Sequence, residues 1–174
     1  QFVCCSATIC NPVEHAANVT GEDEETFSLH DTDYSESGDK KWILWNPPRT
    51  GGEDNKRRSN HTESVRLFSD LVSSGYQTIT FTRTRQGAEE YAMRSENDLR
   101  GRNEHKKATS VQAYEGALTQ KRRGEIEQGL KTGEIEGVWS TSALELGVDI
   151  GGLDSVILDG YPGTLMEAYQ RAGR

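Results

Sequence analysis

The sequence has 174 residues, with 20 lysines and arginines against 28 aspartates and glutamates, and a formal net charge of −8 at pH 7. This length suits one ordinary domain with its own core, and no run of about 18 apolar residues is present that could span a membrane. The net acidity argues against a general basic nucleic-acid-binding protein, although lysines and arginines cluster locally.

The N-terminal segment predicts a short buried strand over residues 2–9, which is apolar almost throughout and stops before Pro12. Cys4, Cys5 and Cys10 match no zinc-ligand spacing and give an odd count for disulfides, so we expect reduced, buried side chains. Reduced cysteines and the lack of a secretory leader predict a cytoplasmic, nucleoid or nuclear protein that is not secreted. A start inside an apolar run, without methionine, predicts a fragment of a longer chain.

The segment from residue 20 to residue 60 predicts a connector. Residues 20–40 are acidic and rich in glycine and serine, and residues 42–45 predict a strand that the following prolines stop. Proline ends a strand because it lacks the N–H group that a sheet requires. Residues 49–60 are polar and predict a flexible loop.

Helical and strand patterns alternate from residue 61 onward. Apolar residues recur at helical spacing between residues 65 and 72, and Gly75 marks the end of that helix. Further helices are expected at residues 86–94 and 120–131, the second capped by Thr119, with a charged loop or frayed helix at residues 95–107. Strands are expected at residues 78–82, 109–114, 136–141 and 155–158. This alternation predicts an α/β fold with a doubly wound parallel sheet and helices on both faces.

Small hydroxyl and basic residues follow several of the predicted strands, at the carboxyl ends where open parallel sheets bind ligands. Hydroxyls and free backbone N–H groups bind phosphate oxygens, and arginine neutralises a phosphate. A carboxylate such as Asp149 can accept a hydrogen bond from a ribose hydroxyl. No G-x-x-x-x-G-K-[ST] motif is present, which excludes a self-contained P-loop ATPase.

Five segments in this order resemble motifs of superfamily 2 helicases. They are Ser6-Ala7-Thr8-Ile9 (motif III), residues 81–85 (motif IV), residues 114–118 with Arg122 and Arg123 (the glycine turn and helix before motif V), residues 140–150 (motif V) and residues 170–174 (the start of motif VI). Two further segments resemble those of the Hrq-type, DEAD/DEAH-box-related DNA helicases. They are Leu44-Trp45-Asn46-Pro47-Pro48 and Gly160-Tyr161-Pro162-Gly163-Thr164. The resemblance covers nearly the whole chain and is weakest over residues 20–40 and 95–107.

The resemblance implies a RecA-like fold and a division into domains. Residues 1–19 would end the first RecA-like domain with the motif III strand, and residues 20–60 would be a linker with the strand that leads into the next domain. Residues 61–174 would be the C-terminal RecA-like domain, truncated within motif VI. The chain would thus lack Walker A and Walker B and be inactive alone.

The resemblance also implies roles for individual residues. Those that would couple ATP state to domain closure are Ser6, Ala7 and Thr8. Those that would contact the nucleic-acid backbone are Thr84, Arg85, Gly116 and Thr141, with Arg83 as a neighbour. Gly147 and Asp149 would approach ATP. Arg174 would be the catalytic arginine finger at the γ-phosphate, with Gln170 and Arg171 beside it, and no residue would ligate a metal.

The implied function of the intact protein is ATP-dependent, 3′-to-5′ unwinding of single-stranded or forked DNA, as in DNA repair. ATP and Mg²⁺ would be bound mainly by the absent N-terminal RecA-like domain, which would be the other partner, and no membrane would be involved. Two alternatives remain: a double-strand translocase or remodeller of the same superfamily, and a non-catalytic nucleic-acid-binding module. Tyr114 and Trp139 fit either core packing, which we favour, or base stacking.

Overall fold

The computed structural model describes residues 1–6, 9–32, 38–51, 56–144 and 150–173. The chain forms two compact units, Gln1–Asn46 and Pro47–Arg174. Among the described residues, no helix is long and apolar enough to cross a membrane.

The first unit contains α1 (Pro12–Thr20) and the short 3₁₀ helix η1 (Glu24–Thr26). Helix α1 was not predicted, because a proline after an apolar run is also typical of the end of a strand. Proline also suits the first turn of a helix, where its missing N–H is not needed. Gly21, in the left-handed region at φ 76°, ends α1 and donates its N–H to the carbonyl of Ala17.

The two strands predicted before residue 47 are absent from the described residues. Phe2 and Val3 are 58% and 89% exposed, and residues 42–45 are exposed as well. The prediction of buried cysteines is also wrong, because all three are exposed. An apolar run becomes a strand only where a neighbouring strand takes its N–H and C=O groups, and no strand pairs with these residues here.

The second unit is built on a four-stranded sheet in the order β2-β3-β1-β4, and every pair is parallel. Its strands are β1 (Thr78–Phe81), β2 (Val111–Tyr114), β3 (Gly137–Ser140) and β4 (Ser155–Leu158). The register aligns their last residues, Tyr114, Ser140, Phe81 and Leu158, side by side. The loops that follow the strands therefore meet at one edge.

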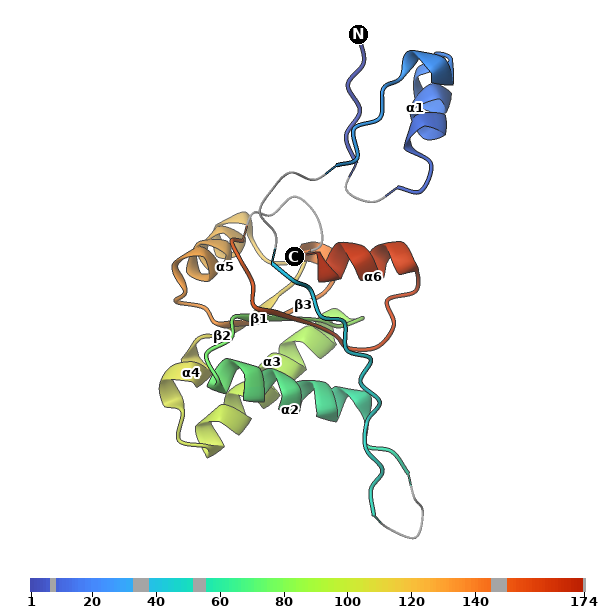
Figure 1. Cartoon of the computed structure of the whole chain (residues 1–174). Helices are drawn as coiled ribbons and strands as arrows, with labels where there is room; N and C mark the ends of the chain where they lie inside the picture. The colour runs from blue at the N-terminus through green and yellow to red at the C-terminus, as the bar shows by residue number, and fades with distance from the viewer. Residues whose placement is uncertain (7–8, 33–37, 52–55, 145–149, 174) are drawn as a thin grey trace. The chain divides into compact units, whose positions relative to one another are not determined.

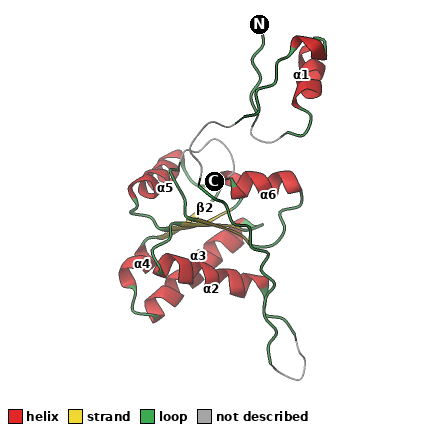
Figure 2. Cartoon of the chain, viewed as in Figure 1, coloured by secondary structure: helices red, strands yellow, loops and turns green. Residues whose placement is uncertain are grey.

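Helices cover both faces of this sheet, which confirms the predicted architecture (Figures 1 and 2). On one face lie α2 (Asn60–Ser73), α3 (Arg85–Gly101) and α4 (His105–Thr109). On the other lie α5 (Gln120–Thr132) and α6 (Leu165–Ala172), while the 3₁₀ helix η2 (Ser142–Leu144) follows β3. Thr119 caps α5 as predicted, because its side chain accepts a hydrogen bond from the backbone N–H of Arg122.

Two helices differ from the sequence prediction. Helix α3 continues to Gly101, within the stretch predicted to be a charged loop or frayed helix, and the side chains of Ser95 and Leu99 there are fully buried. Helix α6 was not predicted, although Thr164 and Glu167 form a capping box at its start. A helix of eight residues spans little more than two turns, so it is hard to recognise from periodicity alone.

The core consists of one apolar cluster on each face of the sheet. The cluster beneath α2 and α3 comprises Phe68, Val72, Ala88, Ala92, Leu99, Ala108, Val111 and Trp139. The cluster on the opposite face comprises Ile79, Phe81, Tyr114, Ile126, Leu130, Val138, Leu144 and Ile150. Tyr114 and Trp139 are 2% and 0% exposed, so the core-packing interpretation of both is confirmed.

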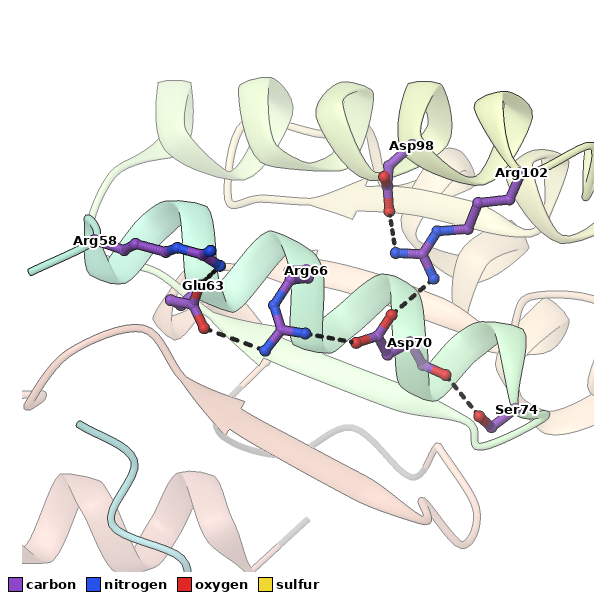
Figure 3. Close-up of polar contacts among 7 residues, drawn as sticks. All are labelled: Arg58, Glu63, Arg66, Asp70, Ser74, Asp98 and Arg102. Carbon is purple, nitrogen blue, oxygen red and sulfur yellow. Dashed lines mark hydrogen bonds and ion pairs between the residues drawn. The ribbon is translucent and has the colours of Figure 1, made fainter. Parts of the chain in front are cut away.

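A chain of alternating charges runs along α2 and joins it to α3 (Figure 3). Arg58 and Arg66 each pair with Glu63, Arg66 also pairs with Asp70, and Arg102 bridges Asp70 and Asp98 at 2.7 Å each. Burial disfavours the charged form of Glu63, but hydrogen bonds from both arginines outweigh it, so the pKa of Glu63 lies below its usual value.

Candidate nucleic-acid interface

An open pocket of about 360 Å³ lies at the carboxyl edge of the sheet. Its lining residues follow β1, β2 and β3 and are Arg83, Arg85, Gly116, Thr141, Ser142 and Ala143. The fold thus brings together Arg83, Arg85, Gly116 and Thr141, which the sequence placed along a nucleic-acid backbone. Two guanidinium groups beside a hydroxyl form a set of donors suited to phosphate oxygens.

The two pocket arginines are held differently. The Nη2 atom of Arg83 donates a hydrogen bond to the carbonyl oxygen of Tyr161 at 2.9 Å, which fixes its direction. Arg85 is exposed, and no hydrogen bond or ion pair joins it to another residue of the described ranges. A Cβ atom on residue 116 would lie 3.8 Å from Arg85 Nη2, an ordinary van der Waals distance, so the Gly116 turn lies directly beside this guanidinium.

Thr84 lies between these arginines and caps α3. Its side chain accepts a hydrogen bond from the backbone N–H of Gly87 at 3.0 Å. A Cβ atom on Gly87 would come within 2.8 Å of that hydroxyl, so the cap requires glycine there. The positive end of the α3 dipole therefore points toward the pocket and adds to its attraction for anions.

The turn after β2 is tied to helix α5. The Nη2 atom of Arg123 donates a hydrogen bond to the carbonyl oxygen of Gly116, and Tyr114 donates one to Glu127 Oε1 at 2.6 Å. Burial, together with the bond to Glu127, raises the pKa of Tyr114 to about 12. These contacts hold the Gly116 turn beside the pocket.

Asp159 is a buried carboxylate that was not predicted as a site residue, and it supports the carboxyl edge of the sheet. The side chain of Asp159, which directly follows β4, is fully buried. It accepts hydrogen bonds from Ser64 Oγ at 2.9 Å, Asn60 Nδ2 at 3.2 Å and Thr82 Oγ1 at 3.3 Å, and it contacts His61 Nδ1 at 2.5 Å. We name this group the Asp159 cluster. Because Thr82 directly precedes Arg83, the Asp159 cluster fixes the backbone from which the pocket arginines project.

The remaining predicted site residues lie elsewhere or outside the described residues. Ser6 is exposed in the first unit, and Gln170 and Arg171 are half-buried on α6. The Arg171 guanidinium lies 5.7 Å from the centre of the Phe81 ring, against the sheet. The predictions for Ala7, Thr8, Gly147, Asp149 and Arg174 fall outside the described residues.

No group of three or more His, Cys, Asp or Glu side chains within the described ranges could hold a metal ion. Gln170 and Arg171, which the resemblance placed beside the arginine finger, are within the described residues, and the Arg171 guanidinium lies over the Phe81 ring.

Comparison with known proteins identifies the family. A family model for the helicase conserved C-terminal domain matches residues 63–174. The chain is 39% identical to the uncharacterized ATP-dependent helicase YprA of Bacillus subtilis over 99% of its own length and 22% of that protein. It is 34% identical to the ATP-dependent helicase HRQ1 of Saccharomyces cerevisiae over 100% of its length and 16% of that protein.

A solved structure agrees with these sequence matches. The DUF1998 helicase MrfA, crystallised with DNA and AMPPNP, superposes with a TM-score of 0.85 at 38% identity, over 97% of this chain and 22% of that one. The chain thus spans about a fifth of the length of these proteins. The helicase resemblance found in the motifs is confirmed, and the chain belongs to the helicase conserved C-terminal domain family.

Proposed function

We propose that this chain is the second motor domain of an ATP-dependent DNA helicase and supplies part of its contact with the DNA backbone. The observation that carries the proposal is the meeting of Arg83, Arg85, Gly116 and Thr141 in one pocket at the carboxyl edge. The relative MrfA was crystallised with DNA, and the YprA and HRQ1 relatives are named as ATP-dependent helicases.

The pocket chemistry favours recognition of phosphates over bases. Arginine forks and a hydroxyl complement phosphate oxygens, and they give contacts that do not depend on base sequence. A motor that moves along DNA needs such sequence-tolerant contacts. The chain as a whole is acidic, with a net charge of −8, so the two arginines make this edge a local basic site.

The finer parts of the proposal rest on the motif resemblance. ATP and Mg²⁺ would be held mainly by a first RecA-like domain, with Gly147 and Asp149 approaching the nucleotide from this domain. Arg174 would stabilise the charge that develops on the γ-phosphate during hydrolysis. Translocation would run 3′ to 5′ on the strand that lies across the pocket.

The test measures single-stranded DNA binding and DNA-stimulated ATP hydrolysis by the intact protein. A plot of log affinity against log salt concentration has a negative slope. We expect Arg85→Ala to make this slope shallower by about 0.7, the value for one phosphate contact on a single strand. Arg100→Ala is the matched control, because Arg100 is an exposed arginine at the other end of α3. Equal slopes for both variants and the wild type would refute the backbone contact.

Two further outcomes separate the alternatives. DNA-stimulated hydrolysis without strand displacement would favour a double-strand translocase or remodeller. DNA binding without any hydrolysis would leave a non-catalytic binding module. Hydrolysis that is lost in Arg174→Ala, while ATP binding is kept, would establish the arginine finger.

A further inference from the structure

An exposed aromatic side chain, Tyr161, follows β4 at the same edge as the pocket. Its side chain is not among the pocket residues, and the residue is 54% exposed. Because β4 pairs with β1 in parallel, with Leu158 opposite Phe81, the loops after both strands leave the sheet at one edge. The strand order therefore puts Tyr161 beyond the β1 loop, at the β4 end of the edge.

The Tyr161 loop is directly bonded to the pocket. The Nη2 atom of Arg83, a lining residue, donates a hydrogen bond to the Tyr161 carbonyl oxygen at 2.9 Å. The main chain of Tyr161 thus lies no farther from the proposed phosphate site than the length of the Arg83 side chain. A nucleotide whose phosphate occupies the pocket would hold its neighbouring bases within reach of this ring.

The loop that carries Tyr161 is held in one shape. Asp159 anchors its start through the Asp159 cluster, and Gly160 turns the chain at φ 90°, a conformation that favours glycine. Pro162 has a fixed φ and restricts the backbone of Tyr161, the residue before it, and the capping box of Thr164 and Glu167 begins α6 soon afterwards. A preorganised aromatic ring loses little conformational freedom when a ligand stacks on it.

We propose that the Tyr161 ring is a stacking platform for a nucleobase of the single strand whose phosphates occupy the pocket. This inference rests on the proposed DNA-binding function and adds a base contact to it. Every base has a π face, so stacking on tyrosine keeps the interaction tolerant of sequence, as a translocating motor requires. The pocket would hold the backbone, and Tyr161 would set the spacing of one base.

The test compares three variants of the intact protein on two ligands. The variants are Tyr161→Ala, Tyr161→Phe and, as matched control, Tyr76→Ala; Tyr76 is 51% exposed and precedes β1 at the opposite edge of the sheet. The ligands are an oligo-dT strand and an abasic sugar-phosphate strand of the same length. Binding is followed by fluorescence anisotropy over a range of salt concentrations.

We expect Tyr161→Ala to weaken oligo-dT binding about tenfold and to leave abasic-strand binding and the salt slope unchanged. Tyr161→Phe, which keeps the π face, should bind as the wild type does, and so should Tyr76→Ala. Equal loss on both strands would overturn the stacking role and point to an effect on the backbone contact that the two strands share. Wild-type affinity in Tyr161→Ala would overturn the stacking role alone, whereas a wild type that binds neither strand would overturn the proposed function.

Discussion

Ser64 Oγ donates a hydrogen bond to Asp159 Oδ1 at 2.9 Å, which fixes the first turn of α2 to the end of β4. Asp159 also accepts a hydrogen bond from Thr82, the residue before Arg83. One buried carboxylate therefore joins a helix on one face to two strands at the ligand edge. The position of the pocket depends on a residue that need not touch the ligand.

Replacement of Asp159 by alanine should destabilise the second unit and weaken DNA binding. The change leaves Asn60, Ser64 and Thr82 without their buried acceptor, and we expect a loss of about 3 kcal/mol of unfolding free energy. Chemical denaturation measures this loss. Asp154→Ala is the control, because the exposed Asp154 accepts a backbone hydrogen bond at the opposite edge. Equal stability of the two variants would contradict the assignment.

Glu63 should make stability depend on pH in the acidic range. Its pKa in the folded protein lies below 4.5, the usual value, so its contribution is complete above about pH 4.5 and is lost as pH falls through the folded pKa. Glu63→Gln should therefore lower the melting temperature at pH 7 by a few degrees, and the difference from wild type should shrink toward pH 3.

Thermal unfolding at both pH values checks this expectation for Glu63. The exposed Glu89→Gln serves as the control, with little effect at either pH. A difference between Glu63→Gln and wild type that is the same at pH 7 and pH 3 would show that the carboxylate charge is not its source.

Replacement by alanine should change the free energy of unfolding in opposite directions at Gly137 and Gly124. A Cβ atom on Gly137 would lie 2.5 Å from Phe68 Cζ and 3.0 Å from Val72 Cγ2, so Gly137→Ala should cost about 1–3 kcal/mol through overpacking between β3 and α2. Gly124 lies within α5 with nothing near its Cβ position, so Gly124→Ala should stabilise by up to about 1 kcal/mol. Urea denaturation of both variants tests the pair, and the same sign for both would contradict this packing.

The sequence predicted the second unit well because its elements carry local signals. The helix that ends at Gly75 and the cap at Thr119 need only nearby residues to be recognised. The pocket could also be predicted, since its residues follow parallel strands whose ends must meet at one edge.

The predictions that failed depend on distant partners. Residues 2–9 predict a strand, but the structure describes no strand beside those of them that it covers, and the length of α3 depends on burial of Leu99 by the folded sheet. Asp159 was missed because its partners lie far away along the chain: Thr82 is 77 residues distant and Asn60 is 99. No local pattern marks a carboxylate whose donors come from such distances.

The opposite edge of the sheet is closed by protein contacts. The side chain of Gln77 donates hydrogen bonds to the carbonyl oxygens of Leu130 and Ile135, and its backbone N–H donates to Asp154. Strands of four residues separate that edge from the pocket by roughly 13 Å, at about 3.3 Å per residue. The exposed turn at Glu134 is therefore a suitable point to attach a dye or a surface tether, which would leave the pocket proposed to bind DNA free for single-molecule measurement.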